Sequence, residues 1–121
     1  MTVTFYAYPG CSTCRSARRW LDDHGIVRTE LDIARDPPGV ATLRMILRRA
    51  GVPLRRLFNT SGQLYRAGDY ARRLTTMDED AALAELAAHG MLVRRPLLLR
   101  GDTAVVGFTA ATYADALLPA P

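Results

Sequence analysis

The feature that most constrains the fold is the alternation of strand, helix and strand signals in the first 33 residues. Residues 2–8 are rich in β-branched and aromatic side chains and end at a Pro-Gly turn, which is typical of a strand. Residues 12–24 then show helical spacing of apolar side chains, and Gly25 is a suitable helix end. Residues 27–33 resemble a second strand. A helical crossover between two strands predicts that they lie parallel and adjacent in one sheet.

The rest of the chain predicts a helical insert followed by a hairpin and a closing helix. Helices are expected at 40–50 and, begun by Asp78, at 78–89, with a short helical turn at 53–58 and Gly90 as a helix end. Two apolar runs, 96–99 and 104–108, flank Arg-Gly-Asp and predict a β-hairpin. Thr109 is the expected cap of a helix at 109–118. The sequence therefore predicts one α/β domain over 1–121, with a mixed four-stranded sheet and an insert at about 37–92.

Charge and hydropathy restrict the class of protein. The net charge is +4, and all 16 basic residues are arginine. Because no aromatic residues interleave with the arginine pairs, we do not expect direct nucleic-acid binding. No apolar run approaches the roughly 20 residues of a membrane span. Residues 1–10 lack the basic and apolar regions of a secretory signal, so we expect a cytoplasmic protein without membrane association.

The two cysteines, Cys11 and Cys14, are the strongest functional signal. A disulfide between them would close a very small loop and constrain the unfolded chain little, so a reactive pair is favoured over a structural one. Cys11 falls at the start of the first predicted helix, where unpaired N–H groups and the helix dipole stabilise a thiolate. Cys14 lies about one turn further along and is expected to be more buried. We expect Cys11 to attack and Cys14 to resolve.

Two other interpretations of the cysteines stay open. Both could be unreactive packing residues, since buried cysteine is common. Zinc binding would need four ligands, and only His24 and His89 remain as further good donors, without a second cysteine pair. We therefore expect no metal.

Three stretches of the sequence stand out: residues 11–21, which begin Cys-Ser-Thr-Cys-Arg, residues 36–38 and residues 92–98. Together with Val-Gly-Phe at 106–108, they resemble the glutaredoxin-dependent arsenate reductase (ArsC) family, and within it the Spx branch. The resemblance implies a thioredoxin-like fold with Cys11 as the reactive thiol. It also implies a cis peptide bond before Pro96, so that Arg95 faces the thiol and holds an oxyanion or thiolate. Further candidates for binding an anion or substrate are Ser12, Thr13, Arg15, Arg94 and Pro96.

The sequence departs from the arsenate reductase pattern at two positions. The resemblance implies three oxyanion-binding arginines, of which Arg95 matches one, whereas Asn59 and Gly107 occupy the other two places. Each lost charge-assisted hydrogen bond weakens binding by about 1.5–3 kcal/mol, so we expect poor arsenate reduction. The second cysteine, Cys14, matches the Spx branch instead.

These observations lead to two functional hypotheses. The first is a thiol-disulfide oxidoreductase with no bound cofactor, which glutathione, glutaredoxin or thioredoxin would reduce. The second is a redox-sensing regulator, similar to Spx, whose Cys11–Cys14 disulfide alters a surface that the RNA polymerase α subunit binds. The chain ends without the basic extension that the resemblance implies for Spx, which favours the enzyme. A family member without turnover is a third alternative.

Overall fold

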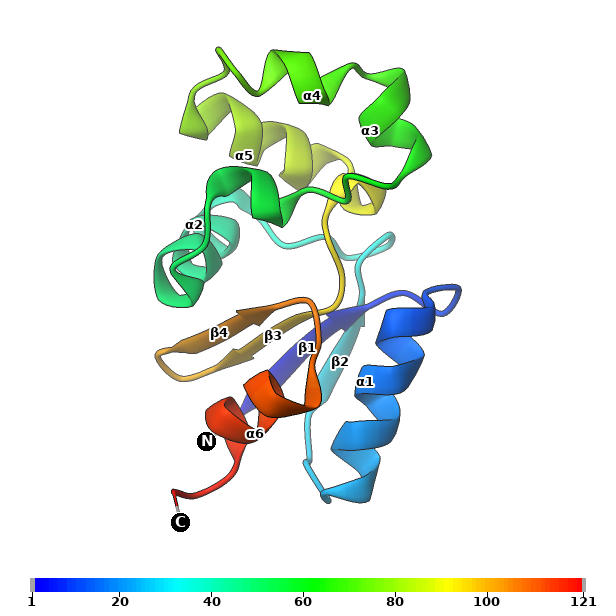
Figure 1. Ribbon diagram of the computed structural model, residues 1–121, viewed down its shortest axis with the longest axis vertical. Helices are drawn as coiled ribbons and strands as arrows, with labels where there is room; N and C mark the ends of the chain where they lie inside the picture. The colour runs from blue at the N-terminus through cyan, green and yellow to red at the C-terminus, as the bar shows by residue number, and fades with distance from the viewer. Residues whose placement is uncertain (1, 121) are drawn as a thin grey trace.

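A computed structural model describes residues 2–120 and contains one four-stranded sheet (Figure 1). The strands are β1 (Val3–Ala7), β2 (Thr29–Asp32), β3 (Leu97–Arg100) and β4 (Thr103–Val106), in the order β2-β1-β3-β4. Strand β1 runs parallel to β2, and β3 runs antiparallel to both β1 and β4. The predicted mixed sheet and its α/β, thioredoxin-like arrangement are confirmed.

Helices cover both faces of the sheet (Figure 1). Helix α1 (Ser12–Asp23) joins β1 to β2, and α6 (Ala110–Leu117) follows β4. The chain between β2 and β3 forms α2 (Val40–Ala50), the 3₁₀ helix η1 (Leu54–Leu57), α3 (Gln63–Ala67), α4 (Tyr70–Arg73), α5 (Glu79–Ala88) and the 3₁₀ helix η2 (Gly90–Leu92). Alternate residues of β1 point to opposite faces. Phe5 therefore packs with α1 and α6, whereas Tyr6 packs with the helices between β2 and β3.

The predicted helix starts are confirmed in atomic detail. The side chain of Asp78 accepts a hydrogen bond from the Ala81 N–H at 2.8 Å. Thr109 and Thr112 form a reciprocal capping box at the start of α6. Each cap satisfies N–H groups that have no partner within the helix.

The second strand is shorter than predicted. It begins at Thr29 instead of Val27, whose side chain is 89% exposed. Strand β2 lies at the edge of the sheet, so the pairing with β1 alone sets its length.

The segment from residue 63 to residue 73 forms two short helices that the sequence pattern did not predict. Tyr65 and Tyr70 anchor α3 and α4, because both rings are buried against Phe58. Helices this short lack a clear apolar period and are stabilised mainly by tertiary packing.

Gly90 has a different role from the predicted one. His89 ends α5, and Gly90 begins η2, where its backbone packs on the end of β2. A Cβ at Gly90 would lie 1.9 Å from the carbonyl oxygen of Ile33. Glycine is therefore required here for close backbone approach.

The sheet topology brings three loops together at one end of the strands. Tyr6 pairs with Leu97, which pairs with Val106 on its other side. The segment after β1, the segment before β3 and the segment after β4 therefore lie side by side (Figure 1). The Gly107 N–H donates to the carbonyl of Pro96 at 2.8 Å, which joins two of these loops.

Candidate functional site

Cys11 lies at the N-cap of α1, directly after the Pro-Gly turn that follows β1. Its backbone is extended (φ −97°, ψ 118°), and its Sγ accepts a hydrogen bond from the Cys14 N–H at 3.2 Å. Cys11 is half-buried as a residue, unlike Cys14. The first turn of α1 reads Ser-Thr-Cys-Arg, and its only charge is positive. Cys11 therefore occupies the position where a helix start stabilises negative charge.

Cys14 is the buried member of the pair. Its side chain has no exposed surface and packs in the cluster that includes Ala17 and Tyr113. Burial, followed by the hydrogen bond to Cys11, raises the pKa of Cys14 to about 12. At neutral pH this residue is therefore a protonated thiol.

Arg95 is near enough to Cys14 for its charge to act on that thiol, and its peptide bond to Pro96 is cis. Its guanidinium centre lies 5.4 Å from the centroid of the Tyr8 ring, and Nη1 donates to the carbonyl oxygen of Met91 at 3.2 Å. Its positive charge opposes the rise in the pKa of Cys14. The Nε of Arg95 is buried and finds no hydrogen-bond partner among residues 2–120, so a donor is available at this place.

The other predicted residues of the first turn lie on its exposed side. Ser12 and Thr13 are the first two residues of α1, and both are exposed. Arg15 reaches back to the carbonyl of Pro9, with Nη1 at 3.5 Å from the oxygen. Ser12 and Arg15, together with Arg19, line a surface hollow of about 390 Å³.

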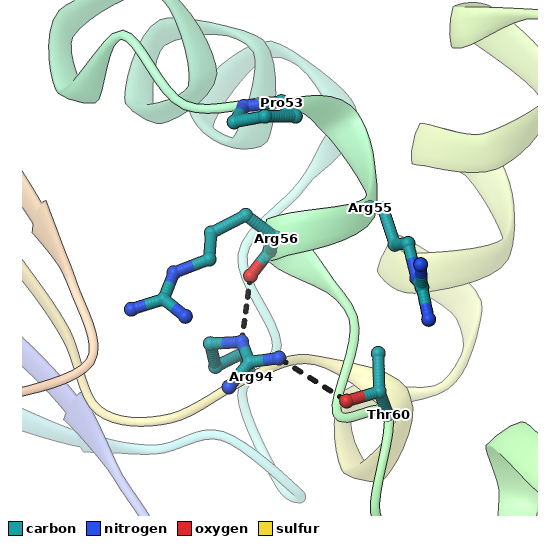
Figure 2. Close-up of a pocket in the computed structure, with 5 residues that line it drawn as sticks. All are labelled: Pro53, Arg55, Arg56, Thr60 and Arg94. Carbon is teal, nitrogen blue, oxygen red and sulfur yellow. Dashed lines mark hydrogen bonds between the residues drawn. The ribbon is translucent and has the colours of Figure 1, made fainter.

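Arg94 forms hydrogen bonds with different partners from those of Arg95, its neighbour in sequence. Its Nε donates to the carbonyl of Arg56 at 2.8 Å, and its Nη2 donates to Oγ1 of Thr60 at 3.3 Å (Figure 2). With Pro53 and Arg55 these residues line a pocket of about 420 Å³. Sequence reasoning missed Arg55, Arg56 and Thr60. The adjacent arginines were a visible signal, but nothing in the sequence pairs them with position 94.

A metal centre is not evident in the described chain. Among residues 2–120, no group of three or more His, Cys, Asp and Glu side chains is placed to hold a metal ion. His24 stacks on Trp20 with ring centroids 3.8 Å apart, and its Nδ1 lies 2.8 Å from the Trp20 carbonyl. None of the helices in the described part of the chain is long and apolar enough to cross a membrane.

Comparison with known proteins decides the family, since the model of the ArsC family matches residues 6–116. The chain belongs to the ArsC family. It is 44% identical over 108 residues to the uncharacterized protein YusI of Bacillus subtilis, covering 89% of this chain and 92% of YusI. It is 28% identical over 110 residues to the global transcriptional regulator Spx of the same organism, covering 88% and 79% of the two chains. An ArsC-related protein from Bacteroides fragilis has a similar structure, with a TM-score of 0.91, 36% identity and coverage of 95% and 97%.

Asn59 and Gly107 occupy the two positions where an arsenate reductase is expected to carry arginine. Asn59 lines a hollow of about 440 Å³ with Arg95 and Met91, and its N–H donates to the Leu92 carbonyl at 2.8 Å. Gly107 has a positive φ of 83°. Neither residue carries a charge, so Arg95 alone among these three positions carries a guanidinium group.

Proposed function

We propose that this ArsC-family protein is a thiol-disulfide oxidoreductase in which Cys11 attacks and Cys14 resolves. The observation that carries the proposal is the placement of two cysteines in unlike environments. Cys11 Sγ accepts a hydrogen bond from an N–H group at the start of α1 and the residue is half-buried, whereas Cys14 is fully buried and protonated at neutral pH. Such an asymmetry suits a nucleophile and a resolving thiol.

The first step forms a mixed disulfide. The Cys11 thiolate attacks one sulfur of a substrate disulfide, a new S–S bond forms, and the other half of the substrate leaves as a thiolate that takes a proton from water. In the second step Cys14 loses its proton and attacks Cys11 Sγ. This attack releases the remaining substrate thiol and leaves the Cys11–Cys14 disulfide. The substrate gains two electrons, and the protein loses two.

The surroundings of Cys14 suggest how the second step follows the first. The hydrogen bond to Cys11 and the charge on Cys11 both raise the pKa of Cys14. A mixed disulfide at Cys11 carries no thiolate charge, so both effects disappear once the first step is complete. The pKa of Cys14 then falls, and the Arg95 charge favours the Cys14 thiolate further.

Arg95 is the residue proposed to stabilise negative charge on sulfur during these steps. The hollow that it lines with Asn59 and Met91 offers space for the substrate. Glutathione, glutaredoxin or thioredoxin would return two electrons to the Cys11–Cys14 disulfide. Arsenate is expected to be a poor substrate, because Asn59 and Gly107 supply no cation.

Mass spectrometry after reaction with bis(2-hydroxyethyl) disulfide tests the proposal. The wild-type protein should lose two mass units as the Cys11–Cys14 disulfide forms. The Cys14→Ser variant should accumulate the mixed disulfide at Cys11. The Cys11→Ser variant, with the buried Cys14 intact, should stay unmodified. Modification of Cys14 before Cys11, or no reaction at either residue in the folded protein, would overturn the assignment.

A redox-sensing regulator is the second candidate, and the likeness to the regulator Spx favours it. In this case the disulfide would change a surface that binds the RNA polymerase α subunit. Retention of purified α subunit on the immobilised oxidised protein, but not on oxidised Cys11→Ser, would support the regulator. Absence of retention in both states, with disulfide turnover intact, would support the enzyme.

A further inference from the structure

A cluster of three arginines lines the pocket beside η1, apart from the thiol pair. Arg55 and Arg56 come from η1, and Arg94 comes from the loop before β3 (Figure 2). Figure 2 shows the Arg56 and Arg94 guanidinium groups close together, with Arg55 on the opposite side and Thr60 below it. The pocket has a volume of about 420 Å³, and the ring of Pro53 adds an apolar wall.

The positive charge of this cluster is not neutralised by the described residues. Arginines elsewhere form ion pairs, such as Arg48 with Glu79 and Arg73 with Glu85. Across residues 2–120, no carboxylate forms an ion pair with any of the three arginines of the pocket. Burial, together with the charges of Arg56 and Arg55, lowers the pKa of Arg94. Like charges held together without a counterion produce a positive potential that favours an anion.

Arg94 is held in place before any ligand binds. Arg94 is fixed at two points, by the Arg56 carbonyl and by Thr60 Oγ1. Because the Thr60 oxygen accepts the bond from Arg94, its own O–H is available to donate to a ligand. Arg94 Nη1 and the guanidinium groups of Arg55 and Arg56 add further donors around the same space. Because Arg94 is ordered in advance, it loses less conformational entropy on binding than a free side chain would.

We propose that this pocket binds a phosphoryl group, either as free phosphate or as the phosphate of a small monoester. Guanidinium groups that approach from different sides match the several oxygens and double charge of a tetrahedral phosphate. A carboxylate has a single charge and two oxygens, and would leave part of this donor set unused. The pocket exceeds the size of phosphate alone, so the Pro53 ring can contact the organic part of a monoester.

The site is separate from the thiols but lies at the same end of the strands. A Cβ added at Gly107 would lie 3.9 Å from Arg56 Nη2, and Gly107 bonds to Pro96. Phosphoryl binding needs no sulfur chemistry, so it should persist in Cys11→Ser. Failure of this proposal and failure of the thiol mechanism are therefore distinguishable.

Two-dimensional ¹H–¹⁵N NMR of the full chain, titrated at low ionic strength, tests the site. The probes are inorganic phosphate, phenyl phosphate and, as a dicarboxylate control, succinate. We expect saturable shifts of the amides of residues 54–60 and 94 with both phosphates, and weaker binding of succinate. Equal affinity for the two phosphates would assign the site to the free ion, and tighter phenyl phosphate binding would assign it to a monoester.

Charge-matched variants separate a site from diffuse attraction. Arg56→Gln should weaken phosphate binding about tenfold or more, because it removes a charge-assisted contact. Thr60→Val should weaken it without changing the net charge. Arg72→Gln is the matched control, since Arg72 is exposed on α4 outside the pocket lining. Non-saturable shifts, equal effects of Arg56→Gln and Arg72→Gln, or succinate binding as tight as phosphate would overturn the proposal.

Discussion

The proton on Cys14 should make the stability of the protein depend on pH in a defined window. In the unfolded chain this thiol has a pKa near 9.0, whereas in the folded protein burial and Cys11 raise the pKa to about 12. Below about pH 8 both states are protonated, and Cys14 contributes no pH dependence. As the pH rises above 9, the unfolded thiol ionises while the buried thiol keeps its proton, so stability falls. The loss continues until the pH reaches the folded pKa.

The size of the effect follows from linkage. One pKa unit corresponds to about 1.4 kcal/mol, and the thiol is fully buried, so its shift is not screened by solvent. Between pH 8 and pH 10, Cys14 should remove about 1.4 kcal/mol of unfolding free energy. Burial also raises the pKa values of Tyr6, Tyr70 and Tyr113 from 10.0, so these side chains begin to contribute as the pH approaches 10. Comparison with a variant that lacks Cys14 therefore isolates the cysteine.

Urea denaturation at pH 8, 9 and 10 under reducing conditions measures the effect, with Cys14→Ala as the reference variant. Removing the sulfur creates a small cavity, which lowers stability equally at each pH. The wild-type protein should therefore lose about 1.4 kcal/mol more than Cys14→Ala over this range. Parallel pH profiles would refute the buried, protonated state of Cys14, and with it the resolving role argued from that state.

Three further predictions concern the fold and the substrate. Gly90→Ala should destabilise the protein by about 3 kcal/mol, because the new methyl group overlaps backbone at the end of β2. Gly39→Ala is the control, since an added Cβ there meets no described atom within 4 Å. In the same thermal unfolding series it should lower stability by less than about 1 kcal/mol. Thr109→Ala should lower the unfolding free energy by about 1 kcal/mol through loss of the capping box of α6, and an unchanged urea midpoint would contradict this role. Arsenate-dependent NADPH oxidation, with glutaredoxin and glutathione supplied, should stay near background, and rapid turnover would contradict the importance given to Asn59 and Gly107.

Much of the fold could be predicted because its signals are local. The helix starts at Asp78 and Thr109 depend on a side chain and an N–H group three residues away. The hairpin β3–β4 depends on a two-residue loop in which Gly101 takes a positive φ of 54°. Such interactions lie within a few residues along the chain, so the sequence carries them directly.

Other features depend on contacts between distant segments and were not predictable. The close approach of Gly90 to the end of β2 requires that the loop before β3 pass over that strand. Helices α3 and α4 depend on the packing of Tyr65 and Tyr70 against Phe58. The pocket of Arg55, Arg56 and Arg94 requires η1 and the loop before β3 to lie together.

The sequence by itself determined where the thiols lie, because a strand, a Pro-Gly turn and a helix start place Cys11 at the N-cap and Cys14 one turn inward. Only the tertiary structure decided what the neighbouring arginines contact. Arg94 and Arg95 are adjacent in sequence, yet Arg95 lies over Tyr8 and Arg94 bonds to Arg56 and Thr60. In extended chain, successive side chains point to opposite sides, and the partners on each side come from segments far away in the sequence.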